Sequence, residues 1–207
     1  MASTRRKFLL AGGAALLLCV VLGALYALGL PPFEDEVGEI KASDVCGTLG
    51  RSSSSAAALK RVLPDKSSYA FDGAVTDPRL DDTDSSYYAS CFVDGDGDQL
   101  LAVTAEMAQY DKAEEWVKDV VENHVPVGTV TPFGAGDKAV ASDKVAAIYF
   151  PCVARGVGQH LSVVAHLKQP RGADGGQLRE GLITLARNAA LAAHKKAKCD
   201  APPKLTH

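Results

Sequence analysis

Residues 91–107 read CFVDGDGDQLLAVTAEM, and this stretch decides between two structures for the middle of the chain. Three of its aspartates stand two positions apart: Asp94, Asp96 and Asp98. An EF-hand calcium loop that began at the first of them would also need glycine at its sixth position and glutamate at its twelfth. Gln99 and Ala105 stand at those positions, so the spacing does not predict an EF-hand.

The same stretch has the pattern of a β-hairpin. Its Asp-Gly pairs are flanked by two runs rich in apolar and aromatic residues, YYASCFV at residues 87–93 and LLAVTAEM at residues 100–107. An Asp-Gly pair between two such runs is typical of a tight turn. We therefore expect two antiparallel strands here, with Gly95 and Gly97 supplying the positive φ angles of the turn.

Further strands and helices follow from periodicity. Polar and apolar residues alternate at residues 69–73, and residues 145–153 and 160–167 are a second candidate hairpin. Apolar stripes at helical spacing mark residues 112–124 and residues 178–198. These elements predict the α+β class, with a largely antiparallel sheet built from two hairpins and covered on one face by amphipathic helices.

The two longer helices have identifiable starts and apolar faces. Asp111 precedes the first of them as a candidate cap, and Trp116 on its stripe is expected to pack against the sheet. One row of residues should bury the second helix against the sheet: Leu178, Leu182, Leu185 and Ala189. A shorter helix at residues 56–63 is stopped by Pro64.

The N-terminal region has the features of a membrane anchor. Residues 8–30 contain no charged residue, and a helix of 23 residues spans roughly 34 Å, enough for a hydrocarbon core of about 30 Å. Arg5, Arg6 and Lys7 precede it, so the N-terminus should stay in the cytoplasm while the rest lies outside. We expect a single-pass cell-membrane protein, with residues 1–30 as an uncleaved signal anchor.

Two other interpretations of this segment stay open. A cleaved signal peptide needs a small-x-small site, of which LYA at residues 25–27 is a poor version. A lipoprotein signal needs a small residue before its cysteine, but Leu18 precedes Cys19. The start STRRKFL, residues 3–9, resembles a twin-arginine export signal, which agrees with export but does not decide cleavage.

The remaining chain divides into three parts. Residues 31–42 begin with two prolines and are acidic, which indicates a spacer. Residues 43–200 contain the predicted strands and helices and form the extracytoplasmic domain, and residues 201–207 are expected to be a flexible tail. Beyond residue 30 the chain carries 19 basic and 25 acidic residues, a net charge of −6. This charge disfavours nucleic acid and anionic membrane surfaces as partners.

Four cysteines predict two disulfides. The fifth, Cys19, lies inside the apolar segment. The four that follow the anchor form an even set, typical of an oxidising compartment: Cys46, Cys91, Cys152 and Cys199. They allow three pairings, of which pairing neighbours in order, the first with the second and the third with the fourth, is favoured. Each bond would close a loop of about 45 residues and stabilise the fold by roughly 4 kcal/mol in the chain-entropy model.

No group of residues predicts catalysis. The serines lie in polar runs or turns, without a G-x-S-x-G motif. His160 and His166 share one face of their predicted strand and could meet the same metal ion, but no third ligand stands at a fitting spacing. The acidic loop at residues 77–84 is expected to be solvated. We therefore predict no catalytic, cofactor-binding or metal-binding site.

Three short motifs resemble those of actinobacterial envelope proteins of unknown function, which carry a membrane anchor or a lipid. They are the helix start CGTL at residues 46–49, the strand cysteine Cys91 and the turn GAGDKA at residues 134–139. The resemblance extends from residue 46 to the closing helix. It implies a non-enzymatic envelope domain.

These observations favour a membrane-tethered, extracytoplasmic interaction or scaffold module of the bacterial cell envelope, without enzymatic activity. Its expected contacts are the membrane, through residues 8–30, and an unknown envelope protein or small ligand. The alternative is an envelope domain that binds a small molecule or a lipid on the concave face of its sheet. A hydrolase is the least favoured of the three classes.

Overall fold

The chain forms two compact units, Met1–Val37 and Gly38–His207. The computed structural model describes residues 19–24, 27, 37–81, 84–154 and 159–205. Residues 19–24 and 27 of the first unit are helical. Among the described residues no helix is both long enough and apolar enough to span a membrane. Most of the expected anchor, residues 8–30, lies outside the described part of the chain.

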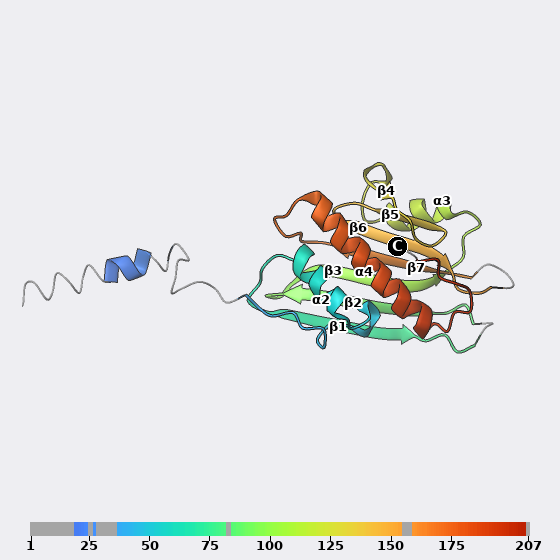
Figure 1. Ribbon diagram of the computed structural model, residues 1–207, viewed down its shortest axis with the longest axis horizontal. Coiled ribbons are helices and arrows are strands. Elements are labelled where there is room, and N and C mark those ends of the chain that lie inside the picture. Colours follow the sequence, from blue (N-terminus) through green and yellow to red (C-terminus); the bar gives the residue numbers. More distant parts are fainter. Residues whose placement is uncertain (1–18, 25–26, 28–36, 82–83, 155–158, 206–207) are drawn as a thin grey trace, which may run out of the picture. The chain divides into compact units, whose positions relative to one another are not determined.

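The second unit contains all the labelled helices and strands (Figure 1). It begins with a 3-10 turn and a helix: η1 (Gly47–Leu49) and α2 (Ser53–Val62). Three strands follow: β1 (Tyr69–Asp77), β2 (Tyr88–Gly95) and β3 (Asp98–Ala108). Helical turns come next: α3 (Ala113–Trp116), the π-helical η2 (Val117–Val121) and η3 (Val127–Thr129). The remainder is β4 (Thr131–Pro132), β5 (Lys138–Ala141), β6 (Val145–Pro151), β7 (His160–Leu167) and α4 (Gly175–Lys196).

One antiparallel sheet of seven strands, in the order β1-β2-β3-β7-β6-β5-β4, makes the protein an α+β fold. The two expected hairpins are parts of larger units, a three-stranded meander β1–β3 and a four-stranded meander β4–β7. The meanders join where β3 pairs with β7, with Val103 opposite Ala165. The additional strands β4 and β5 are two and four residues long, too short for an alternation pattern to show.

The hairpin predicted from the Asp-Gly pattern is β2–β3. Its loop consists of Asp96 and Gly97, whose φ angles of 51° and 88° are both positive. Positive φ at both loop residues is the geometry that follows the twist of the flanking strands. Gly95, expected to share this role, is instead the last residue of β2 and pairs with Asp98.

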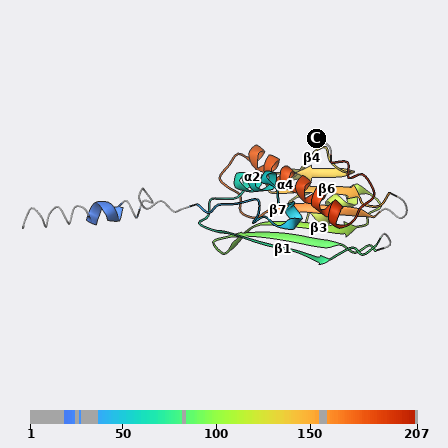
Figure 2. The same cartoon turned by 60° about the horizontal axis from the view of Figure 1, so that its bottom comes forward.

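Helices α2 and α4 cover the first face of the sheet (Figures 1 and 2). The predicted row of α4 is buried there: Leu178, Leu182, Leu185 and Ala189. They pack on alternate sheet residues such as Val103, Ile148 and Val163. Helix α4 also crosses α2 closely, because a Cβ at Gly181 would overlap the Val62 side chain. The small alanine and glycine side chains of α4 thus let α2 and α4 pack closely together on the same face of the sheet.

The helix that carries Trp116 lies on the second face, so the helices do not all cover one face. Trp116 is fully buried with Val140, Val145 and Tyr149, which alternate along their strands with the first-face residues. The indole Nε1 donates a hydrogen bond to Ser162 Oγ at 2.9 Å. Asp111 does not cap this helix, which begins after Lys112 without a side-chain cap.

Both disulfides lie on the first face, paired in the order favoured by the sequence. Cys46–Cys91 joins the start of η1 to β2, and Cys152–Cys199 joins the end of β6 to the end of α4. The first bond lies over β1, where Gly73 pairs with Cys91. A Cβ at Gly73 would stand 2.6 Å from the Cβ of Cys46, so only glycine leaves room for this disulfide.

Residues at both ends of the predicted domain belong to its packing. Ile40, predicted in the spacer, is buried, and the amide of Gly38 donates to Lys66 O at 2.8 Å. Ala201, expected to begin a flexible tail, is 3% exposed, and the carbonyl of Lys204 accepts from Gly136 N at 2.9 Å. These apolar and hydrogen-bonded contacts hold the described part of the tail against the sheet.

Candidate functional site

A groove of about 820 Å³ lies between α4 and the segment that links η1 to α2. This volume is within the range of small-molecule sites. Its lining residues are Gly47, Gly50, Arg51, Ser52, Asn188, Leu191, Ala192, Lys195, Lys196 and Lys198. A smaller hollow at the start of α4 is lined by charges of both signs, Arg61, Asp174 and Glu180, and shows no preference for either.

One wall of the groove is the outer side of α4. Asn188, Leu191, Ala192 and Lys195 recur at i, i+3, i+4 and i+7, so they lie on one side of the helix. Leu191 leaves 53% of its surface exposed, although the rest of the helix buries its leucines almost completely. An exposed leucine on this stripe gives the groove an apolar strip.

The other wall is η1 with the residues that link it to α2, and a covalent and a polar contact hold η1 in place. The disulfide at Cys46 anchors its start, and Thr48 Oγ1 donates to Ser90 O at 3.0 Å. Gly50, with φ of 81°, ends the turn. A Cβ built at Gly47 would meet nothing within 4 Å, so this wall has open space where a side chain could stand.

The groove is positively charged although the chain beyond residue 30 is acidic. Its described lining residues include four cations and no carboxylate: Arg51, Lys195, Lys196 and Lys198. The first turn of α2 adds to this polarity, because its free amides carry partial positive charge next to the Ser52 cap. The lysines also lie where the C-terminal end of α4 favours cations. The arrangement suits an anionic ligand with a small apolar part.

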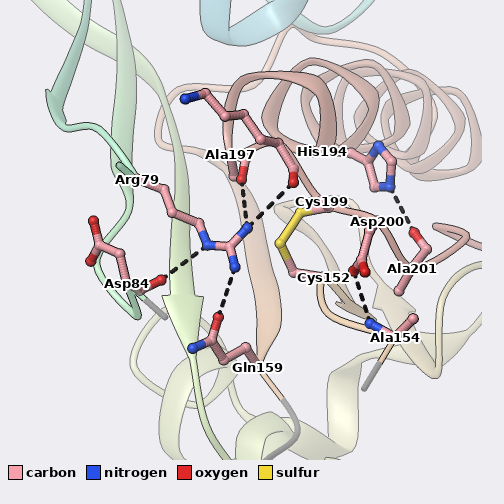
Figure 3. The surroundings of a disulfide bond; sticks show 11 residues. Arg79, Asp84, Cys152, Ala154, Gln159, His194, Ala197, Cys199, Asp200 and Ala201 are labelled. Atoms are coloured by element: carbon pink, nitrogen blue, oxygen red, sulfur yellow. Dashed lines mark hydrogen bonds between the residues drawn. A yellow bond between two sulfur atoms is a disulfide. The ribbon is translucent and has the colours of Figure 1, made fainter. Parts of the chain in front are cut away.

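A buried arginine binds the backbone at the end of α4, next to one end of the groove. Arg79 is 3% exposed, and its guanidinium donates to the carbonyls of Asp84, Ala197 and Lys198 at 3.0, 3.1 and 3.3 Å. It also donates to Gln159 Oε1 at 3.3 Å. The Cys152–Cys199 disulfide lies beside this network (Figure 3). Arg79 thus fixes the backbone that carries Lys198.

The acidic loop at residues 77–84, predicted to be solvated, forms hydrogen bonds through Arg79 and Asp84. The Asp84 carboxylate accepts from the hydroxyl and amide of Ser86 and from the amide of Leu80. These hydrogen bonds, the Ser86 hydroxyl first, lower the pKa of Asp84 to about 2. The Asp84 carboxylate therefore stabilises this turn by accepting hydrogen bonds from it.

Two aspartates of the β2–β3 hairpin have structural partners. Asp96 Oδ1 accepts from Ser67 Oγ at 2.7 Å and from the amide of Ser68 at 3.1 Å. The Ser67 hydroxyl is the main reason why the pKa of Asp96 is lowered. Asp98 forms an ion pair with Lys66 at 3.4 Å. These contacts join the turn to the start of β1.

The two histidines that share a face of β7 have separate partners. His160 Nε2 lies 3.2 Å from Asp137 Oδ2, and its ring stacks on Tyr149 with centroids 4.3 Å apart. His166 instead faces His124, with ring centroids 4.7 Å apart. Within the described ranges, no group of three or more histidine, cysteine, aspartate or glutamate residues could hold a metal ion.

The electrostatics of the second face follow from these pairs. Burial alone would raise the pKa of Asp137, but the hydrogen bonds and charges of Lys204 and His160 outweigh it and lower the pKa. Burial, followed by the charges of His124 and neighbouring lysines, lowers the pKa of His166 to about 4. Burial is also the first cause of the lowered pKa of His124, so both rings of this pair are neutral at pH 7.

No protein-family model, curated protein or solved structure matches this chain. The candidate site therefore depends on its own geometry. Sequence reasoning missed the groove, because Gly47, Gly50 and Arg51 come from a segment about 140 residues earlier in the chain than the α4 residues that they face. Leu191 could have indicated the groove from the sequence, because this leucine lies off the buried apolar stripe of its helix.

Proposed function

We propose that this protein is a membrane-tethered, extracytoplasmic binding module of the bacterial cell envelope, without enzymatic activity. The observation that carries the proposal is the basic groove between α4 and η1. Its walls are held by a disulfide and by packed helices, so a ligand would meet a preformed surface.

The cellular location in this proposal is supported by two features of the chain. The uncharged segment at residues 8–30 follows three basic residues, which favours a signal anchor with a cytoplasmic N-terminus. Two disulfides close the domain, and such bonds persist in oxidising compartments. The twin-arginine-like start and the resemblance to actinobacterial envelope proteins agree with this location.

Fractionation of cells that express the full chain tests the tether. We expect it in the membrane pellet after an alkaline carbonate wash, whereas a variant without residues 2–30 should leave the pellet. Protease added to spheroplasts should digest the domain, and non-reducing thiol labelling should find its four cysteines oxidised. A full-length chain in the cytosol with four reactive thiols would contradict the proposal.

Site-specific photo-crosslinking in intact cells tests the groove. A benzoylphenylalanine at Leu191 should give a discrete adduct, and the same group at Val75, an exposed apolar residue of β1, should not. Adding Gly47→Trp should abolish the adduct, because the indole would occupy the open space beside η1. Equal labelling at both positions would mean that the groove is ordinary surface.

A further inference from the structure

We propose that the groove binds the headgroup of an anionic phospholipid from the membrane in which the chain is anchored. This inference rests on the proposed tether and groove, and it names the ligand. The phosphate would lie among Arg51, Lys195 and Lys196, and the glycerol and first acyl carbons would lie on Leu191 and Ala192.

Charge complementarity selects an anion. Four cations line the groove without a carboxylate among the described lining residues, while the exported chain as a whole carries −6. That net charge would repel a flat anionic surface within a Debye length of about 8 Å, and salt would screen the repulsion at larger distances. A single headgroup inserted between the lysines would instead experience the local positive field.

The apolar strip distinguishes a lipid from a plain anion. Leu191 is 53% exposed and stands between Asn188 and Lys195 on the same side of α4. A glycerolipid can remove the exposed part of the Leu191 side chain from water, and inorganic phosphate cannot. Nucleic acid fits less well, because single strands bind through aromatic stacking and the described lining residues include no aromatic ring.

The proposed tether makes the membrane the nearest source of this chemistry. Seven residues separate Leu30 from Gly38, and they reach at most about 25 Å when fully extended. A domain held at that distance meets headgroups at a high effective concentration, so a modest intrinsic affinity suffices. A soluble acidic peptide would have no such advantage.

Calorimetric titration of the full chain in neutral phosphatidylcholine nanodiscs tests the inference. The titrants are dihexanoyl phosphatidylglycerol, dihexanoyl phosphatidylcholine, glycerol phosphate and an octaglutamate peptide, all below the micelle concentration of the short-chain lipids. We expect dihexanoyl phosphatidylglycerol to bind at least tenfold more tightly than each of the others.

Two kinds of variant distinguish the contribution of the groove's charge to lipid binding from that of its open space. Lys195→Glu/Lys196→Glu should weaken dihexanoyl phosphatidylglycerol at least tenfold, and its matched control is Lys112→Glu/Lys118→Glu on the α3–η2 segment. Gly47→Trp keeps every charge and should weaken the same lipid at least tenfold by filling the groove. Its control is Gly128→Trp, another glycine whose added Cβ meets nothing within 4 Å.

The outcomes distinguish this inference from the proposed function. Equal binding of glycerol phosphate would overturn a lipid ligand, and equal binding of phosphatidylcholine would overturn recognition of the anion. If octaglutamate bound more tightly than the lipid and lost this binding in both groove variants, the lipid would not be the ligand. The proposed function would stand, with acidic proteins as the partners. Titrations that no groove variant alters would overturn both proposals.

Discussion

The two faces of the sheet are stabilised by different chemistry. The first face is covered by α2 and α4, buries aliphatic residues and alanine, and holds both disulfides. The second face carries a stack of Trp116, Tyr149 and His160, and the facing pair His124 and His166. The first face should therefore respond to reduction and the second to protonation. The predictions below test this division, from the largest expected effect to the smallest.

Trp116→Ala should have the largest effect, a loss of about 5 kcal/mol in the free energy of unfolding. This is the upper end of the range for removing a buried aromatic side chain, because the change also leaves the Ser162 hydroxyl buried without its indole partner. Urea denaturation followed by far-ultraviolet circular dichroism measures it. Trp116→Phe should cost less than half as much. A loss below 1 kcal/mol for the alanine variant would show that the second face contributes little.

Cys46→Ala/Cys91→Ala should reduce the free energy of unfolding by about 4 kcal/mol. The 45-residue separation of the two cysteines sets the entropy that the crosslink removes from the unfolded chain. The same denaturation experiment measures the loss, and adding dithiothreitol to the wild type should reproduce part of it. Trp116→Ala should lose the same amount in oxidised and reduced protein. If it instead lost far less after reduction, the two faces would be coupled.

Arg79→Met should cost about 2 kcal/mol, because it leaves buried carbonyls without their donor. Hydrogen exchange at residues 84–88 and 197–199 should accelerate, which would locate the loss at the Cys152–Cys199 end. The matched control is Arg171→Met, since this exposed arginine also bonds a carbonyl, that of Lys60, and should cost under 1 kcal/mol. Similar losses for both variants would argue against a special role for the buried guanidinium.

The smallest predicted effect is a pH dependence carried by the second face. The folded pKa of His166, about 4, lies below its unfolded value of 6.5, so the neutral ring is the stabilised form. Its contribution to stability is complete above pH 6.5 and is lost as the pH falls toward 4. Solvent screens this half-exposed ring, so we expect about 1–2 kcal/mol.

Denaturation curves between pH 7.5 and 4 measure this dependence. His166→Gln should flatten the acid limb, whereas Cys46→Ala/Cys91→Ala should lower the whole curve without changing its slope. The groups that face this ring are His124, Lys144 and Lys168, and all act in the same direction. An unchanged slope in His166→Gln would place the acid sensitivity elsewhere.

Local patterns predicted much of the fold. The Asp-Gly hairpin, the antiparallel sheet, the buried row of α4 and the pairing of the cysteines agree with the structure. Each of these features depends on residues that are near one another in sequence, or, for the disulfides, on pairing each cysteine with its neighbour along the chain. Sequence patterning did not reveal that the Trp116 helix covers the second face, since an apolar stripe shows only that a helix is buried. The strand β4 was missed because its two residues are too few to show an alternation.

Local sequence patterns predicted the longer strands and helices, because side-chain periodicity and turn chemistry act between neighbours. The sequence by itself also determined the uncharged segment at residues 8–30 and the even set of cysteines that suggest export. Which side chains meet across long sequence separations depends on the tertiary fold. It placed Asp137 beside His160 and His124 beside His166, and it buried Arg79 at the end of α4. It also placed Gly47 and Arg51 opposite Lys195. Such contacts depend on how layers pack, and no local pattern records that packing.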